Sequence, residues 1–207
     1  MSRTGGVWME YIWYFFGYGF LGYLFEKAFA RVTKSAHQVR KGCLLMPICP
    51  VYGLAMVAIL VCGAERIESF GNLMIFGAVI ATTVEYMVHW GYEALFSVYF
   101  WDYSDTKMDI GGRICLPFSL VWGLLSATAV RFIQPVMQAL AVRIPTAVTD
   151  LVLVCFAIDL MYSARVLLLY GDIELLAPSA LRRREKRMAS AIRFFYMSCE
   201  IQAQRSW

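Results

Sequence analysis

Three ionisable residues stand four positions apart within one apolar stretch of the chain: Glu85, His89 and Glu93. Residues at i, i+4 and i+8 lie along one stripe of an α-helix. Such a stripe fits three kinds of chemistry: metal binding, a proton or substrate path, or hydrogen bonds between helices. The second Glu-x-x-His motif that di-metal helical bundles use is absent, so we predict no metal site and no cofactor.

A short polar loop follows this stripe and carries Asp102, Asp105 and Arg113, with paired glycines at Gly111 and Gly112. The planar guanidinium of arginine suits carboxylate and phosphate groups, so we expect Arg113 to pair with Asp102 or Asp105, or to bind an anion. The glycines permit tight turns. The side chains expected to anchor this loop are Trp101, Tyr103, Ser104 and Asp105.

The elements that position these residues are predicted to be membrane-spanning helices. Apolar and aromatic residues make up 60% of the 207 residues and charged residues only 16%. A soluble domain carries more charge than this. Several apolar runs reach about 20 residues, which is the length that crosses ~30 Å of hydrocarbon. The chain is therefore predicted to be an all-α integral membrane protein.

Five spans are predicted, together with a basic amphipathic helix after them. The spans cover residues 8–29, 50–62, 72–96, 115–133 and 147–170. Pro47 and Pro50 lie at the apolar start of the second span, which predicts either a bent, partly re-entrant approach or a helix that begins at proline. A transmembrane domain over 1–175 and a cytoplasmic helix and tail over 176–207 follow from this division.

Ionisable residues within predicted spans are costly to insert, so they tend to face the protein interior. Two of them, Glu85 and Asp159, fall near the middle of the membrane by position. The predicted substrate or proton path comprises Glu26, Glu85, His89, Glu93, Asp102 and Arg113. The predicted anchors around one vestibule comprise Pro47, Pro50, Tyr52, Trp101, Tyr103, Ser104 and Asp105.

Positive charge predicts the orientation. The segment between the first two spans and the C-terminal tail are rich in Lys and Arg, whereas the alternate loops carry few. The positive-inside rule then places the N-terminus outside and the C-terminus in the cytoplasm, so the vestibule faces the cytoplasm. Residues 179–198 place arginines opposite apolar positions at helical spacing, which is typical of a helix lying on an anionic inner leaflet. Docking of a cytoplasmic partner is the alternative for this helix, and nucleic acid is not an expected partner.

The sequence resembles the ABC-transporter type IV permease family of bacterial membrane proteins. The resemblance spans roughly residues 10–135 and is carried by five motifs in the family's order: GYLFE (22–26), KGxLxxPICPVYG (41–53), TTVEY (82–86), FWDYS (100–104) and GRICLPFSLVWG (112–123). It implies a permease component of the bacterial inner membrane. These 207 residues contain no GxxxxGK[ST] phosphate loop, so the resemblance implies a separate cytoplasmic ATPase.

Three functions compete on this evidence. The first is a transporter subunit that forms a homo-oligomer, with Glu26, Glu85 and Glu93 lining its path and the cytoplasmic loops coupling it to its partner. The second is an intramembrane enzyme acting on a lipid or isoprenoid head group, with Asp102 or Glu93 as acid or base and Arg113 holding an anion. The third is a regulatory or assembly protein without chemistry. The six cysteines show no CxxC spacing and no GxSxG or HExxH motif is present, so no catalytic constellation is complete in the sequence. The family resemblance favours the transport role, and we expect no enzymatic activity.

Overall fold

The computed structural model describes residues 4–33, 42–188 and 190, and this part of the chain is mostly helical. Three helices are long and apolar enough to cross a membrane. They are α3 (Phe70–Phe96), the continuous run Leu116–Ala141, and α6 (Thr146–Tyr170). These helices coincide with the third, fourth and fifth predicted spans, which supports a helical membrane protein.

The first two predicted spans have a different character. Helix α1 (Thr4–Val32) is long enough to span, but it is rich in glycine and aromatic residues and carries charges at both ends. Helix α2 (Pro50–Val61) has 12 residues, which at 1.5 Å per residue covers about 18 Å and falls short of the hydrocarbon thickness. The structure therefore supports three of the five predicted spans as full membrane crossings.

Helix α2 begins at Pro50, as predicted for a proline-started helix, and an irregular segment over residues 42–49 precedes it. The carboxylate of Asp159 on α6 accepts hydrogen bonds from the backbone amides of Leu45 (2.9 Å) and Met46 (2.7 Å). Ser163, one turn later, accepts from the amide of Leu44 at 2.8 Å. The buried acid in α6 thus supplies the partners that irregular backbone needs inside an apolar environment.

Small residues allow the helices to pack closely. A Cβ atom added at Gly123 of α4 (Leu116–Thr128) would lie 2.4 Å from the carbonyl oxygen of Met74 on α3. A Cβ atom at Gly53 of α2 would lie 2.4 Å from the carbonyl oxygen of Phe15 on α1. Side chains as large as a methyl group are excluded at both positions, in the manner of small-residue contacts between membrane helices.

The helix that contains α4 continues beyond the predicted end at Ile133. A π-helical turn, η2 (Ala129–Ile133), connects α4 to α5 (Gln134–Ala141), which carries Pro135 in its first turn. Proline lacks an amide donor and its ring collides with the carbonyl four residues earlier, and a π turn relieves that conflict. Arg131 in this turn donates to the carbonyl oxygens of Ile67, at 3.1 Å, and Glu68.

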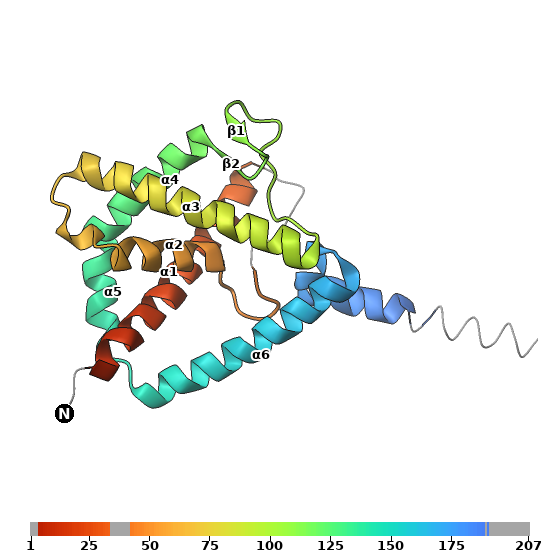
Figure 1. Cartoon of the computed structure of the whole chain (residues 1–207). Coiled ribbons are helices and arrows are strands. Elements are labelled where there is room, and N and C mark those ends of the chain that lie inside the picture. The colour runs from red at the N-terminus through yellow and green to blue at the C-terminus, as the bar shows by residue number, and fades with distance from the viewer. Residues whose placement is uncertain (1–3, 34–41, 189, 191–207) are drawn as a thin grey trace, which may run out of the picture.

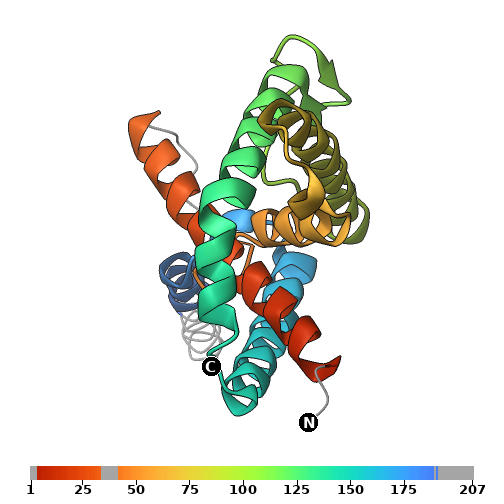
Figure 2. The same ribbon diagram turned by 90° about the vertical axis from the view of Figure 1, so that its left-hand side faces the viewer.

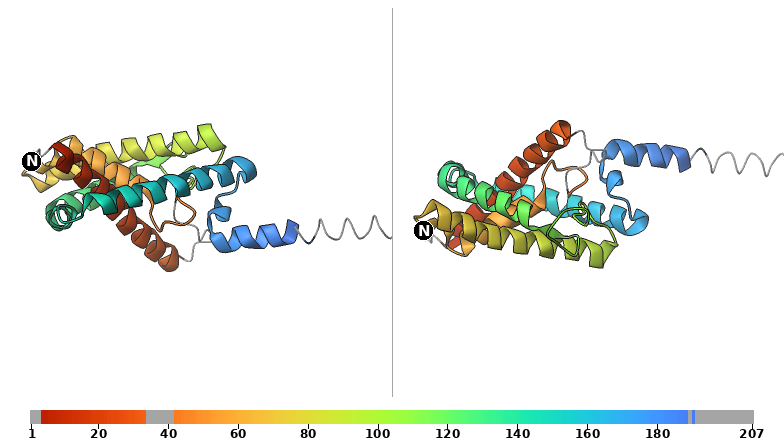
Figure 3. Two further views of the ribbon diagram at one scale, coloured as in Figure 1. Left: turned by 90° about the horizontal axis from the view of Figure 1, so that it is seen from below. Right: turned by 90° about the horizontal axis from the view of Figure 1, so that it is seen from above.

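The connecting segments divide between two ends of the molecule. The start of α1, the loop 62–69 and the turn 142–145 lie at one end, and the loop 97–115 and the end of α6 lie at the other (Figures 1 and 3).

The chain after α6 folds back on the second of these ends. A short 3-10 helix, η3 (Ile173–Leu176), buries Leu175 and Leu176 in a cluster with Val166 and Val98. Residues 178–188 and 190 are helical, so the first half of the amphipathic helix predicted over 179–198 is described, and residues 189 and 191–198 lie outside the described residues.

Candidate functional site

A cavity of about 290 Å³ lies between α1, α2, α3, α4 and the loop 97–115. A second cavity of about 230 Å³ adjoins it and shares Tyr52, Glu85 and Trp122 in its wall. The walls are mostly aromatic and aliphatic. The polar and aromatic side chains that line the larger cavity include Glu26, Tyr52, Glu85, Tyr92, Trp101, Tyr103, Phe118 and Trp122.

Two carboxylates face this cavity and each accepts a hydrogen bond from a tyrosine. Tyr103 donates to Oε1 of Glu85 at 3.0 Å, and Tyr52 donates to Oε1 of Glu26 at 2.8 Å. Glu85 is only 3% exposed. Acidic residues from α1 and α3, far apart in the sequence, therefore meet at one buried site.

The second oxygen of Glu85 has no partner among the described residues. Its Oε2 atom is buried without a hydrogen bond, and Nε1 of Trp122 lies beside the carboxylate, also buried, without completing one. Trp122 itself packs edge-to-face against Tyr52, with ring centroids 4.9 Å apart. A buried acceptor and a buried donor left unpaired cost free energy, so this pair marks a place where a ligand group or water would be stabilised.

The loop between α3 and α4 places Tyr103 in the cavity. It contains a short hairpin in which β1 (Asp109–Ile110) pairs with β2 (Ile114–Cys115). Gly111 and Gly112 at its turn both have positive φ, at 61° and 69°, which side chains other than glycine rarely adopt. The ring of Tyr103 stacks on Phe118 with centroids 5.0 Å apart. Burial of Tyr103 and its bond to a carboxylate raise the pKa of its hydroxyl well above the usual range.

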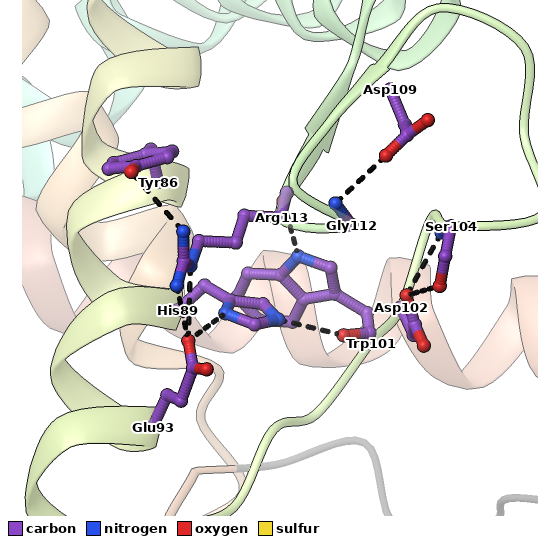
Figure 4. Close-up of polar contacts among 9 residues, drawn as sticks. All are labelled: Tyr86, His89, Glu93, Trp101, Asp102, Ser104, Asp109, Gly112 and Arg113. Carbon is purple, nitrogen blue, oxygen red and sulfur yellow. Dashed lines mark hydrogen bonds and ion pairs between the residues drawn. The ribbon is translucent and has the colours of Figure 1, made fainter.

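Arg113 pairs with Glu93, whereas the sequence predicted a pair with Asp102 or Asp105. Its Nε and Nη2 atoms lie 3.1 and 2.8 Å from Oε2 of Glu93, and Nη1 donates to the hydroxyl of Tyr86 at 3.3 Å (Figure 4). The bond to Glu93 raises the pKa of Arg113 above its usual value. The sequence expectation failed because it considered neighbours within the loop, whereas the loop folds against α3.

His89 on α3 also contacts the loop 97–115. Its Nε2 atom lies 3.0 Å from the carbonyl oxygen of Trp101, and because a carbonyl only accepts, Nε2 carries the proton (Figure 4). Nδ1 lies 3.9 Å from Oε2 of Glu93. The indole of Trp101 in turn donates to the carbonyl oxygen of Arg113 at 3.0 Å. Figure 4 shows these contacts as one network.

Asp102 and its neighbours stabilise the loop itself. Oδ1 of Asp102 accepts from the backbone amide of Ser104 at 2.9 Å and from the hydroxyl of Ser104. These hydrogen bonds lower the pKa of Asp102. Asp109 plays a similar part at the hairpin, where it accepts from the amide of Gly112 at 2.9 Å. Both carboxylates therefore serve turn formation rather than facing the cavity.

The predicted site residues fall into three groups. Glu26, Pro50, Tyr52, Glu85, Trp101 and Tyr103 line the larger cavity. His89, Glu93 and Arg113 form the network that holds the loop on α3. Asp102, Ser104, Asp105 and Pro47 are exposed and lie outside the cavity wall.

Sequence reasoning missed Trp122, which lines both cavities and packs against Tyr52. Its position in the sequence could have identified it. Tryptophan is enriched at the ends of membrane helices, whereas Trp122 lies inside α4 next to the closely packed Gly123. Across the described residues, no group of three His, Cys, Asp or Glu side chains is placed to hold a metal ion.

Comparison with known proteins places these elements in a family. The family model described as "Putative ABC-transporter type IV" matches residues 13–164. Searches of curated proteins and of solved structures gave no match. The matched segment covers most of the chain and every residue that lines the larger cavity. The chain therefore belongs to the putative ABC-transporter type IV family.

Proposed function

We propose that this chain is the membrane-embedded component of an ABC-type transporter and that the cavity around Glu85 contacts the transported substrate. The observation that carries the proposal is the Oε2 atom of Glu85, which is buried in a cavity of about 290 Å³ without a partner among the described residues. Ionisable groups placed within membrane helices are costly and usually mark a substrate or ion path. Family membership supports the same reading.

The cavity is proposed to face the cytoplasm. The loop 97–115 that forms part of its wall lies at the same end of the molecule as the end of α6 (Figure 1). Residues 182–187 after α6 contain five Lys and Arg residues: Arg182, Arg183, Arg184, Lys186 and Arg187. The positive-inside rule assigns that end to the cytoplasm, where the basic segment meets the anionic inner leaflet.

A separate ATPase is proposed to supply the energy. The 207 residues lack a phosphate-binding loop, and an ABC-type mechanism hydrolyses ATP on the cytoplasmic side. Arg113 and His89 hold the loop 97–115 against α3 at the proposed cytoplasmic end. We propose that this loop transmits conformational changes of the ATPase to the cavity. A second copy of the chain is proposed to complete the path, because three full crossings enclose little space.

The alternative, an enzyme acting on a lipid or isoprenoid head group, has less support. Its expected anion-binding residue, Arg113, already donates hydrogen bonds to Glu93 and Tyr86 through three nitrogen atoms. Of its two expected acids or bases, Asp102 is exposed and bound to Ser104, and Glu93 is bonded to Arg113. None of these three residues belongs to the wall of the larger cavity.

Affinity purification of the full chain in a mild detergent, followed by mass spectrometry of the retained proteins, tests the proposal. We expect a protein with a phosphate-binding loop to be retained in a fixed ratio to the chain. Charge reversal of the loop network by Glu93→Lys should reduce its retention, and Glu65→Lys at the opposite end should not. Absence of any retained ATPase from both wild-type and control samples would overturn the transporter assignment.

A further inference from the structure

We propose that the cavity around Glu85 is a binding site for an organic ammonium group, a positively charged nitrogen that carries alkyl substituents. This inference rests on the proposed function, because it names the chemical class of the substrate for the same cavity.

Half of the residues that line the larger cavity are aromatic. They are Tyr52, Tyr92, Trp101, Tyr103, Phe118 and Trp122, with Phe25, Phe29 and Phe100 towards the rim. Tyr52 meets Trp122 edge-to-face with ring centroids 4.9 Å apart, and Tyr92 meets Phe100 with centroids 4.7 Å apart, so packed aromatic pairs from different elements line the cavity. Aromatic faces attract cations, and clusters of them are the usual site for alkylated ammonium ions.

The charged groups of the wall are carboxylates. Among the described residues, the wall contains Glu26 and Glu85 and no Lys, Arg or His. The nearby cation, Arg113, lies outside the wall and is bonded to Glu93. A positively charged ligand would therefore complement the site and give Oε2 of Glu85 the partner it lacks.

The composition of the wall favours an organic cation over a metal ion. Hard metal ions take about six oxygen ligands, and here aromatic carbon surrounds the carboxylates. The volume of about 290 Å³ sits at the lower end of the ~300–1,000 Å³ range of ligand pockets, which suits a small, rounded headgroup.

The cavity has apolar residues at its rim on both α1 and α4. Phe25 and Phe29 on α1 and Val121 on α4 line the larger cavity and are also substantially exposed. Figure 2 shows the C-terminal half of α1 diverging from α4. An ammonium group could therefore come from water as a free ion or from the bilayer as the headgroup of an amphiphile, with its chain between these two helices.

Calorimetric titration of the full chain, purified in an uncharged maltoside detergent, tests the inference directly. The probe is tetramethylammonium, and 2,2-dimethyl-1-propanol serves as a neutral probe of similar shape. We expect saturable binding of tetramethylammonium and none of the alcohol. Glu85→Gln should weaken binding by about tenfold or more, because it removes the charge while keeping the shape of the side chain. Glu65→Gln, exposed and outside the cavity, should bind as wild type does.

A second titration with dodecyltrimethylammonium, read by native mass spectrometry, distinguishes the two sources. Glu85-dependent binding of both probes identifies a free ion, and Glu85-dependent binding of the long-chain probe alone identifies a lipid-borne headgroup. Equal binding of the charged and neutral small probes, or no Glu85-dependent binding of either ammonium probe, overturns the inference. Because no ATPase takes part, these results are separate from the retention experiment, so failure of the transporter assignment and failure of ammonium binding are distinguishable.

Discussion

Tyr103 reaches from the loop between α3 and α4 to Glu85 inside α3, and its hydroxyl donates a 3.0 Å hydrogen bond to Oε1 of the carboxylate. The residue that closes the cavity is thus supplied by the loop, while the charge is supplied by the helix. Glu93 and Arg113 hold the same loop and helix together outside the cavity, at 2.8 Å. Displacement of the loop would therefore change the surroundings of Glu85.

Tyr103→Phe removes this donor while keeping the ring that stacks on Phe118. We expect the free energy of unfolding to fall by about 1–3 kcal/mol, because a buried carboxylate oxygen loses its partner. Thermal or denaturant unfolding in detergent measures the change. In a Glu85→Gln background, Tyr103→Phe should lower the free energy of unfolding by less, because the acceptor is no longer a carboxylate. An equal loss in both backgrounds would show that the two residues are not coupled.

Asp159→Ala should release the segment 42–49 from α6. Two backbone amides, those of Leu45 and Met46, lose their acceptor, and each buried donor left unpaired costs about 1–3 kcal/mol. Hydrogen exchange read by mass spectrometry should show faster exchange in this segment. Asp150→Asn, on an exposed part of the same helix, is the control and should leave the exchange unchanged.

Gly77→Ala and Gly91→Ala form a matched pair on α3. A Cβ atom at Gly77 would lie 2.6 Å from Cβ of Ser126 on α4, whereas nothing lies within 4 Å of a Cβ atom at Gly91. We expect Gly77→Ala to lower the free energy of unfolding of the protein by about 1–3 kcal/mol through overpacking. Gly91→Ala should instead raise the free energy of unfolding by about 0.5–1 kcal/mol, because alanine favours a helix. Comparable melting temperatures for the two variants would contradict the packing of α3 on α4.

Arg113→Lys should loosen the loop 97–115 without disturbing the helices. A lysine has one nitrogen and cannot contact Glu93 through two atoms and Tyr86 through a third. We expect faster proteolytic cleavage within the loop and unchanged helical circular dichroism. Lys107→Arg, in the same loop, serves as the control; cleavage at the wild-type rate in Arg113→Lys would mean that the pair does not hold the loop.

The sequence predicted the regular part of the fold well. Long apolar runs identified α3 and α6 to within about two residues, and Pro50 marked the start of α2. The second span, predicted over 50–62, matches α2 to within one residue, but a helix of 12 residues does not by its length confirm a membrane crossing, so the five-span count stays a prediction. The continuation of α4 past Ile133 was missed because Arg131 and Pro135 interrupt the apolar run, and the π turn that accommodates them is a local adjustment.

The sequence predicted the acidic residues of the cavity but not their partners. Glu26 and Glu85 stood out as charges within apolar helices. Their contacts with Tyr52 and Tyr103 depend on how a loop and a second helix pack, which spacing along one helix does not encode. The same reason explains the wrong partner expected for Arg113. Partners distant in sequence require the tertiary fold.

Native mass spectrometry of the chain purified in a mild detergent, as wild type and as Glu85→Gln, tests the central claim most directly. The account predicts that both samples retain an ATPase and that only wild type retains a positively charged small molecule or lipid. Identical small-molecule adducts in both samples, with no ATPase in either, would contradict the claim that this cavity is the substrate site of a transporter component.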